Sequence, residues 1–325
     1  MDVSVVGGGV IGLSAAWRLA QRGDAVTLYD PAPGSGASHV AAGMLAPVTE
    51  VHYGEEAVLE LNLESARRYP RFVAELERAT ELTTGYQPSG TIVVARDGDD
   101  LAALDRLSSF QRDLGLEVTR LRAGVCRELE PGLAPGIRGG LLVAGDHQVN
   151  PRLLVAALLQ GCRHAGVRFV AERVTEIPAG DVTVIAAGCW SGDIGGVDIS
   201  VRPVKGQLLR LRGKAGIERT VRGLDCYIVP RPDGEVVVGA TVEERGFDTT
   251  VTAGAIYELL RAAVELVPDV AELELAEASA GLRPATADNA PLIERRGDVV
   301  IATGHYRNGV LLAPLTADLV AELVA

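Results

Sequence analysis

The first thirty residues contain the feature that most constrains the fold, a glycine-rich turn between a short apolar strand and a helix. The run Asp2–Val6 predicts a buried strand, residues 13–21 have helical apolar spacing, and Ala25–Tyr29 predicts a second strand. Residues 7–12 read Gly-Gly-Gly-Val-Ile-Gly and match G-x-G-x-x-G. A strand, this turn, a helix and a second strand form the βαβ unit that binds a nucleotide.

Each glycine of the turn has a separate physical reason. Gly7 permits the tight turn, Gly9 lets a pyrophosphate approach the backbone, and Gly12 lets the helix pack closely on the strand. Asp30 ends the second strand, where its carboxylate can accept from a ribose hydroxyl. The alternatives are a plain glycine turn and, for Asp30, a turn residue before Pro31. No second fingerprint occurs, so the pattern favours either FAD alone or NAD alone.

The rest of the chain alternates between two kinds of segment. Apolar strands are predicted at 182–187 and 299–302, and antiparallel-type strands at 207–212, Tyr227–Pro230 and Glu235–Gly239. Helices are expected over 59–76, 99–114, 151–164, 252–267 and 311–324, and Pro70 should kink or split the first of them.

This order predicts an α/β fold with two domains. A Rossmann-like FAD-binding domain is expected to be assembled from residues 1–85, 145–197 and 281–325. An inserted substrate-binding domain with a mainly antiparallel sheet is expected from residues 86–144 and 198–280.

Composition excludes several classes of protein. Thirty-one Lys and Arg against 43 Asp and Glu give a net charge of −12 without a basic cluster, so we expect neither nucleic-acid nor membrane binding. The four scattered cysteines predict neither a zinc site nor a disulfide framework, and they suit a reducing compartment. With no targeting segment evident, we expect a cytoplasmic protein.

Further motifs cover nearly the whole chain in order. They are VVGGGVIGLSAAWRLA, ASHVAAGMLAP from Ala37, VIAAGCWSG from Val184, RPVKGQLLRL from Arg202, CYIVPR from Cys226, VVVGATVE from Val236, AGLRPATADNAPLI from Ala280 and TGHYRNGVLLAPLTADLV from Thr303. Together they resemble the D-amino-acid oxidase family of FAD-dependent oxidoreductases, and within it the glycine oxidases of thiamine biosynthesis.

The resemblance implies an enzyme that uses non-covalent FAD and oxygen to deaminate a small amino acid. Its leading case is glycine to glyoxylate, ammonia and hydrogen peroxide, with iminoglycine supplied for the thiazole of thiamine. The alternatives are a D-amino-acid or sarcosine oxidase or dehydrogenase on the same scaffold. An NAD-linked dehydrogenase and a non-catalytic flavin-binding protein are more distant alternatives. A homo-oligomer is also expected from the resemblance.

The same resemblance assigns roles to residues. Arg283 would pair with the substrate carboxylate, Tyr227 would hydrogen-bond it, and Arg307 would lie near the flavin and the substrate amine. The expected cofactor-binding residues are Gly7, Gly9, Val10, Ile11, Gly12, Asp30, Ser38, Ala42, Gly43, Met44, Leu45, Val174, Gly188, Trp190, His305, Asn308, Gly309, Val310 and Leu311.

Residue chemistry supports the carboxylate site independently, because Arg offers two parallel N–H donors and Tyr adds a neutral one. The alternatives are a structural ion pair for Arg283 and strand packing for Tyr227. We interpret His305 as a loop residue near the flavin in preference to a base, and Trp190 as core or flavin packing.

Two positions depart from the family pattern. Asp225 stands where the resemblance leads us to expect histidine, and Val242 where it leads us to expect methionine. Both are expected to border the substrate, so a carboxylate at position 225 could alter substrate preference.

Overall fold

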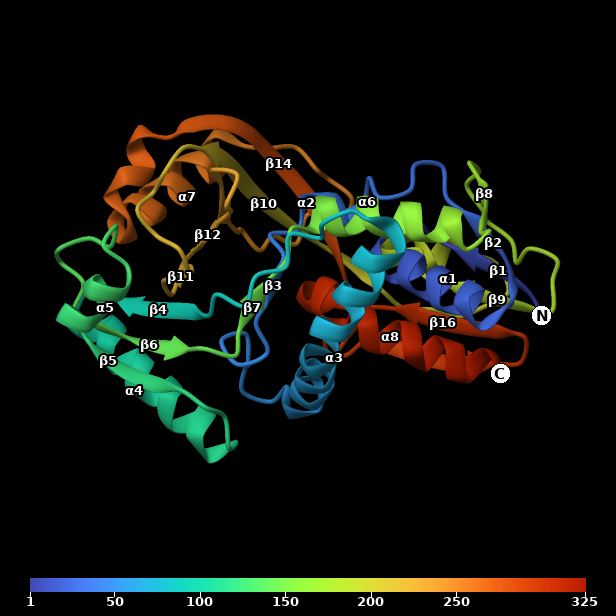
Figure 1. Cartoon of the computed structure of the whole chain (residues 1–325), viewed down its shortest axis with the longest axis horizontal. Coiled ribbons are helices and arrows are strands. Elements are labelled where there is room, and N and C mark those ends of the chain that lie inside the picture. Colours follow the sequence, from blue (N-terminus) through green and yellow to red (C-terminus); the bar gives the residue numbers. More distant parts are fainter.

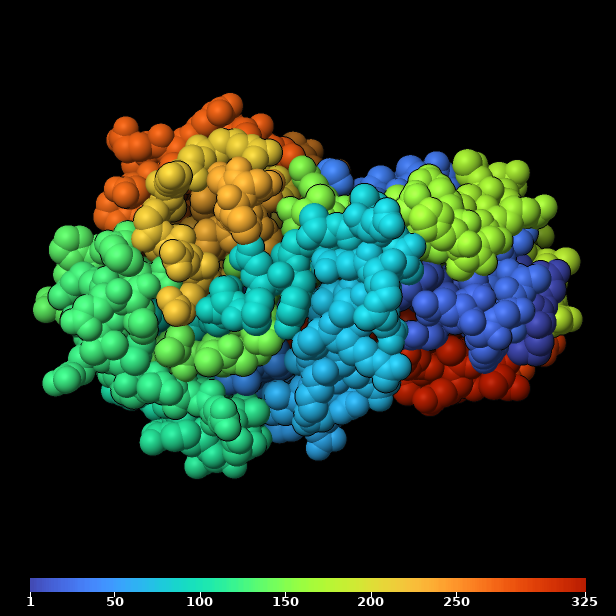
Figure 2. Space-filling model, in the orientation of Figure 1, coloured from blue at the N-terminus to red at the C-terminus, as the bar shows by residue number.

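The computed structural model describes residues 1–325 and contains two large β-sheets that lie side by side along the long axis of the molecule (Figure 1). A small third sheet pairs β3 (Met44–Leu45) with β7 (His147–Gln148). The two ends of the chain, blue and red in Figure 2, cover the same end of the molecule. The arrangement is a mixed α/β fold, as the order of segments predicts.

The six-stranded sheet collects strands from the start, the middle and the end of the chain. All neighbouring strands are parallel, except that the edge strand β15 runs antiparallel to β16. The order across the sheet is β15 (Leu292–Arg296), β16 (Val299–Thr303), β9 (Val182–Ile185), β1 (Asp2–Val6), β2 (Ala25–Tyr29) and β8 (Arg168–Val170). The central strands are buried on both faces, which explains their continuous apolar sequence.

The helices around this sheet share one apolar core of 33 residues. They are α1 (Val10–Arg22), α3 (Glu56–Thr80), α6 (Pro151–His164) and α8 (Gly309–Val324). Gly23 ends α1 in the left-handed conformation, and the Asn150 side chain caps α6 by accepting from the N–H groups of Arg152 and Leu153. These local signals fix where each helix begins or ends.

The expected split of the long helix at Pro70 is wrong, because α3 continues through it. An interior proline costs about 3 kcal/mol. The helix face that carries Phe72, Val73 and Leu76 is buried in the core, and each such side chain contributes about 1.5–3 kcal/mol on burial. Packing of that face therefore outweighs the lost hydrogen bond.

The eight-stranded sheet is antiparallel except where β11 and β4 run parallel. Its order is β14 (Glu274–Ala285), β10 (Arg202–Arg212), β13 (Glu235–Gly239), β12 (Tyr227–Pro230), β11 (Thr220–Arg222), β4 (Thr91–Ala95), β6 (Gly139–Val143) and β5 (Thr119–Arg122). The edge strand β14 continues to Ala285, so Arg283 belongs to this sheet.

A second core of 21 residues lies between this sheet and its helices. The helices of this core are α5 (Ala123–Leu129) and α7 (Ala253–Leu266), followed by the short turn η2 (Pro268–Glu272). Helix α4 (Gly98–Asp113) instead packs its Leu104 in a separate small cluster with Val93, Ala95 and Leu141. Asp97 caps α4 and Thr252 caps α7, each by accepting a backbone N–H. None of the helices combines the length and the apolar composition of a membrane-spanning segment.

Short elements lie where the two sheets approach each other. They are α2 (Ala37–Val40) and the single turns η1 (Gly188–Asp193) and η3 (Tyr306–Asn308). All three contribute residues to the large cavity described below.

Candidate active site

The turn after β1 has no room for side chains at two of its glycines. Gly7 has φ +108°, and a Cβ there would lie 2.4 Å from the carbonyl oxygen of Ala186. A Cβ on Gly12 would lie 1.9 Å from the oxygen of Gly7. The turn, the helix and β9 therefore approach as closely as backbone allows, and the N-terminus of α1 carries no acidic residue in its first turn. Such a helix end suits a phosphate.

Asp30 fixes the same turn from the end of β2. Its carboxylate accepts from the N–H of Gly8 at 2.6 Å and from that of Ala32 at 2.7 Å. It also lines the cavity, and a carboxylate that accepts two hydrogen bonds retains lone pairs for a ribose hydroxyl. The binding interpretation and the turn interpretation of Asp30 are thus compatible.

A cavity of about 680 Å³ extends from the glycine turn to the eight-stranded sheet. Its volume lies in the range of cofactor and ligand sites, about 300–1,000 Å³. Most of the expected cofactor-binding residues line it, namely Gly7, Gly9, Val10, Ile11, Asp30, Ser38, Ala42, Gly43, Met44, Val174, Gly188, Trp190, His305, Asn308, Gly309 and Val310.

Three expected residues lie behind the wall. Gly12 packs on Gly7, whereas Leu45 and Leu311 are buried in the apolar core beside the six-stranded sheet. A strand-like or helical run alternates between wall and core, so neighbours in a motif do not all face the cavity.

Two backbone N–H groups on the wall have no partner in the protein. Ala42 and Gly43 are buried and line the cavity, yet neither amide donates to a protein acceptor. Buried N–H groups without partners are rare, because leaving them unpaired costs free energy. Together with the glycine turn, they give this wall the donors that a flavin dinucleotide needs, so the residues present fit FAD.

Arg283 on β14 lies over the backbone of the neighbouring strand. Its Nη1 donates to the carbonyl oxygens of Thr241 at 3.1 Å and Lys205 at 3.4 Å. A Cβ on Gly206 of β10 would lie 2.4 Å from that nitrogen, so the glycine makes the room for the guanidinium. Four arginines line the cavity, and Arg283 is the one that forms no ion pair with a carboxylate.

Tyr227 on β12 lies on the same face of the sheet, and the strands β10 and β13 separate β12 from β14. A Cβ on Gly239 of β13 would lie 2.4 Å from its hydroxyl oxygen, so a second glycine accommodates the ring. Burial raises the pKa of Tyr227, and the positive charge of Arg283 acts in the opposite direction. The phenol therefore stays protonated and can donate, and it has no hydrogen-bond partner in the protein. Neither Arg283 nor Tyr227 has a carboxylate partner in the protein, so both side chains can bind the carboxylate of a substrate.

Arg307 lines the cavity from η3, but carboxylates already hold its guanidinium. Its Nη2 pairs with Glu55, and its Nε lies 3.5 Å from Glu50. Glu50 also pairs with Arg222 on β11. Arg307 is thus a member of an ion-pair chain. Sequence reasoning missed Arg222 and Glu50, which line the cavity, and Glu55, which pairs with Arg307 without lining the cavity.

The ion-pair chain keeps its carboxylates charged. Burial acts to raise the pKa of Glu50, but Arg222 and Arg307 outweigh it and hold that pKa below its usual value. The pKa of Glu55 is also lowered: burial acts against this, and hydrogen bonds from Arg307 and Asn289 prevail. No local sequence signal marks these partners, because Glu50 and Arg222 lie 172 residues apart.

His305 lies in the cavity wall with a buried ring. Its Nε2 is 2.9 Å from Thr316 Oγ1 on α8, and burial lowers the pKa of His305 to about 3. The imidazole is therefore neutral and already hydrogen-bonded. The Nε2 atom is therefore occupied by Thr316, and the place of His305 near a cofactor stays a prediction.

The departures from the family pattern lie at the mouth of the cavity. Asp225 is bound to Arg96 at 2.7 Å, and Arg96 also pairs with Asp100 and Glu265. The carboxylate of Asp225 thus has an ion-pair partner, which it shares with two other carboxylates. Val242 is exposed.

Trp190 is 39% exposed and lies 5.7 Å from the ring of Phe247, so it is not a core residue.

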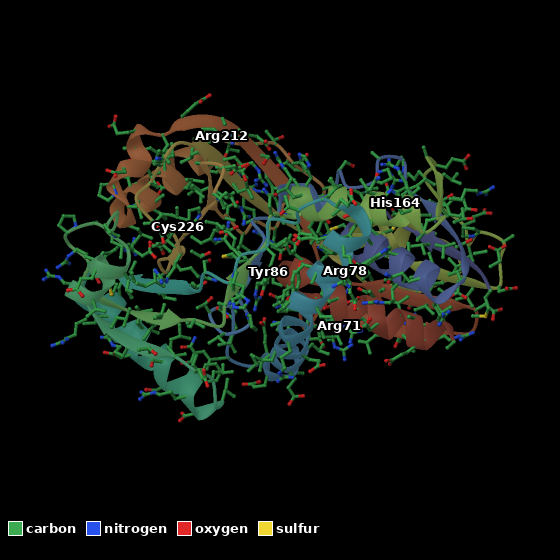
Figure 3. All side chains as sticks on the ribbon, in the orientation of Figure 1. Arg71, Arg78, Tyr86, His164, Arg212 and Cys226 are labelled. Atoms are coloured by element: carbon green, nitrogen blue, oxygen red, sulfur yellow. The ribbon has the colours of Figure 1, made fainter.

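The four cysteines are free and buried; Cys226 lies near β12 in Figure 3. Burial raises the pKa of each thiol, which leaves all four unreactive at neutral pH.

Comparison with known proteins identifies the family of the chain. The FAD dependent oxidoreductase family, DAO, matches residues 2–323. The chain is 36% identical to glycine oxidase of Geobacillus kaustophilus, over 99% of this chain and 92% of the relative. It is 36% identical to the proposed thiamine biosynthesis oxidoreductase ThiO of Rhizobium etli, over 99% and 96%.

The crystal structure of glycine oxidase from Geobacillus kaustophilus superposes with a TM-score of 0.93 at 35% identity, covering 99% of this chain and 94% of that one. The match extends over both sheets and all segments of the cavity wall. The chain therefore belongs to the DAO family of FAD-dependent oxidoreductases.

Proposed function

We propose that this protein oxidises glycine to glyoxylate, ammonia and hydrogen peroxide with FAD bound in the cavity. The observation that carries the proposal is the guanidinium of Arg283, which has no carboxylate partner, on the same face of the sheet as the protonated hydroxyl of Tyr227. A small amino acid offers one strong handle, its carboxylate, and these two groups match it. In this proposal the six-stranded sheet holds FAD and the eight-stranded sheet holds the substrate.

The charges on the cavity wall favour a substrate with one carboxylate. Glu50 and Glu55 pair with Arg222 and Arg307, which leaves Arg283 as the cavity-lining arginine without a carboxylate partner. One substrate carboxylate neutralises it, whereas a second would be left unpaired in a partly buried site at a cost in binding free energy. Monocarboxylic amines are therefore preferred to dicarboxylic ones.

Bound FAD supplies a two-electron acceptor for the hydride of the substrate α-carbon. The protein holds the carboxylate with Arg283 and Tyr227, which fixes the position of the α-carbon. The ammonium proton leaves to solvent, because His305 is already hydrogen-bonded and the wall carboxylates are held by arginines. Hydrolysis of the imine then gives glyoxylate and ammonia, and oxygen takes up the two electrons as hydrogen peroxide.

The alternative substrates are D-amino acids and sarcosine on the same scaffold, with a dehydrogenase as the alternative to an oxidase. The exposed Val242 leaves room for a larger amine at the mouth. The relatives named glycine oxidase and ThiO favour glycine, and they support a role in supplying the imine for the thiazole of thiamine. Four free, buried thiols suit the reducing cytoplasm that we propose as its location.

A substrate panel tests the proposal. Purified holoenzyme is mixed without oxygen with glycine, sarcosine, D-alanine, D-proline or iminodiacetate, and the loss of the flavin absorbance is followed. We expect glycine to bleach the flavin fastest and iminodiacetate slowest. Faster bleaching by a bulkier amine would identify that amine as the substrate in place of glycine. If none of the five compounds bleached the flavin, the proposed reaction would be wrong.

A further inference from the structure

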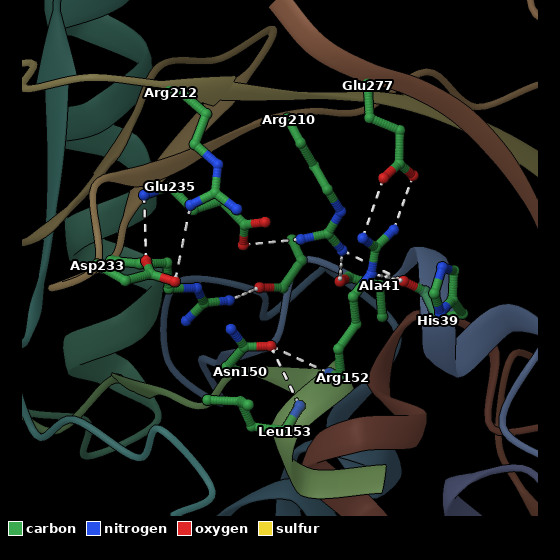
Figure 4. Close-up of polar contacts among 12 residues, drawn as sticks. His39, Ala41, Asn150, Arg152, Leu153, Arg210, Arg212, Asp233, Glu235 and Glu277 are labelled. Atoms are coloured by element: carbon green, nitrogen blue, oxygen red, sulfur yellow. Dashed lines mark hydrogen bonds and ion pairs between the residues drawn. The ribbon is translucent and has the colours of Figure 1, made fainter. Parts of the chain in front are cut away.

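Three arginines converge on the backbone of residues 39–42, one wall of the cavity. Arg210 on β10 donates through Nη2 to the carbonyl oxygens of His39 at 3.2 Å and Ala41 at 3.3 Å. Arg152 at the start of α6 donates to His39 at 3.1 Å, and Arg231 after β12 donates to the carbonyl of Ala42. Figure 4 shows Arg152 and Arg210 pointing from different elements at this segment.

Each arginine is itself held in place. Glu235 accepts from Arg210 at 2.9 Å, and both oxygens of Glu277 accept from Arg152, at 2.7 and 3.0 Å (Figure 4). Arg231 donates to the side-chain oxygen of Gln148 at 2.6 Å. The carbonyls of the segment thus meet donors that have little freedom to move.

Arg231 is an unusual group to bury. It is 7% exposed and forms no ion pair, and burial lowers its pKa to about 10. Burying a cation without a paired carboxylate costs several kcal/mol in typical proteins, so local packing alone does not favour it. The cation does meet the carbonyl of Ala42, which indicates a role in fixing that peptide.

The geometry of the peptide bond links these carbonyls to the cavity. In a trans peptide the C=O of one residue and the N–H of the next point in opposite directions. Arg210 holds the C=O of Ala41, which turns the N–H of Ala42 away from it. Arg231 holds the C=O of Ala42, so the N–H of Gly43 points away from Arg231. These are the two unpartnered amides of the cavity wall.

The segment lies at the end of the cavity next to the substrate side. Ala42 belongs to a small apolar cluster with Leu208, against which Met44 and Tyr227 pack. Donors placed here face the part of a dinucleotide that meets the substrate, where negative charge grows on reduction.

We propose that Arg210 and Arg231 are positioning residues that aim the N–H groups of Ala42 and Gly43 at the flavin and so raise its electron affinity. The proposal rests on FAD binding in this cavity. Donors that are fixed before charge develops stabilise that charge without reorganisation. Loss of either arginine should free a peptide to rotate and make the flavin a weaker electron acceptor.

Sulfite affinity and reduction potential of the bound flavin test this directly, because both report how electron-poor the ring is and neither needs substrate. For Arg210→Met and Arg231→Met holoenzymes we expect sulfite to bind at least about tenfold more weakly; a tenfold change in a two-electron equilibrium is about 30 mV. Arg210→Lys should recover part of the loss, since it keeps the charge but loses the forked geometry.

Arg212→Met is the matched control. Arg212 is on the same strand, 51% exposed, and lies 3.9 Å from Asp233 rather than near the segment (Figures 3 and 4). It should leave sulfite affinity and potential unchanged. If the methionine variants do not fold, the sulfite affinity and reduction potential of Arg210→Lys and Arg231→Lys are compared with the wild type instead, and both should be lowered.

Flavin-loaded variants with wild-type sulfite affinity and potential would overturn the positioning role. A wild-type protein that takes up no FAD would instead refute the cofactor assignment itself. The two failures are therefore distinguishable.

Discussion

The guanidinium of Arg283 lies against the Cα of Gly206 on the neighbouring strand, where an added methyl group would stand 2.4 Å from Nη1. The two residues are on adjacent strands, with Arg283 opposite Val204 and Gly206 two residues further along β10. The side chain therefore crosses the backbone of β10 at the glycine. Its two backbone acceptors then hold it over the sheet.

Gly206→Ala should displace Arg283 without removing it. Because the methyl group would overlap the guanidinium, we expect the KM for glycine to rise at least about tenfold while FAD stays bound, equivalent to about 1.4 kcal/mol. Steady-state kinetics and the flavin spectrum measure the two effects. Gly254→Ala is the control, since a Cβ there meets no atom within 4 Å. Equal KM values in both variants would contradict the relationship.

Tyr227→Phe should have a smaller effect than loss of the arginine. The ring remains over Gly239 and only the hydroxyl donor is removed. A neutral hydrogen bond is worth about 0.5–1.5 kcal/mol, so the KM for glycine should rise about two- to twelvefold. A change in KM larger than that caused by Gly206→Ala would show that Tyr227 does more than donate to the carboxylate.

Asp225→Asn should leave glycine oxidation nearly unchanged. The carboxylate is 55% exposed and already paired with Arg96, and exposed ion pairs contribute about 0–1 kcal/mol. Arg96 keeps Asp100 and Glu265 as partners. We expect less than a threefold change in KM for glycine and the same order of substrates. A reordered substrate panel would instead show that the charge at position 225 reaches the substrate.

His305 should make the fold sensitive to acid. Burial lowers its pKa to about 3 from 6.5, so the unfolded chain takes up a proton first as pH falls. The stability that the neutral ring contributes is present above pH 6.5 and is lost as pH falls towards 3. At pH 5 the loss is about 2 kcal/mol.

Urea unfolding of holoenzyme at pH 7 and pH 5 measures this loss. His305→Gln cannot titrate and should lose less stability between the two pH values than the wild type. His164→Gln, on the exposed end of α6 (Figure 3), is the matched control and should behave as wild type. An undiminished loss in His305→Gln would assign the acid sensitivity to other groups.

The local parts of the fold could be predicted from sequence because their causes are local. Gly7 and Gly12 have positions where only glycine fits, and Asn150 and Thr252 cap the helices that follow them. The strands β9 and β16 could be predicted because continuous apolar sequence is typical of strands buried on both faces. The predicted split of α3 at Pro70 was wrong because the effect of a proline is local, whereas the helix is held by tertiary packing of its apolar face in the core.

The long-range parts of the site could not be predicted in the same way. Arg283 and Tyr227 came from motifs, but the ion pair of Glu50 with Arg222 joins distant segments that only the fold brings together. The buried donor Arg210 lies in apolar strand sequence and Arg231 lies in the turn after β12, and nothing local distinguishes either of them from a surface arginine. Gly206 and Gly239 did carry a signal, since a glycine inside a strand often marks a close approach.

Arg283 is proposed to bind the carboxylate of the amino acid that reduces the flavin. The most direct measurement is rapid anaerobic mixing of glycine with wild-type and Arg283→Met holoenzyme, following flavin absorbance over a range of glycine concentrations. We predict that the wild type saturates with glycine, and that the variant keeps its FAD but needs at least about a hundredfold more glycine, as expected for about 2.7 kcal/mol. The same glycine dependence in both proteins would show that Arg283 does not bind the substrate carboxylate.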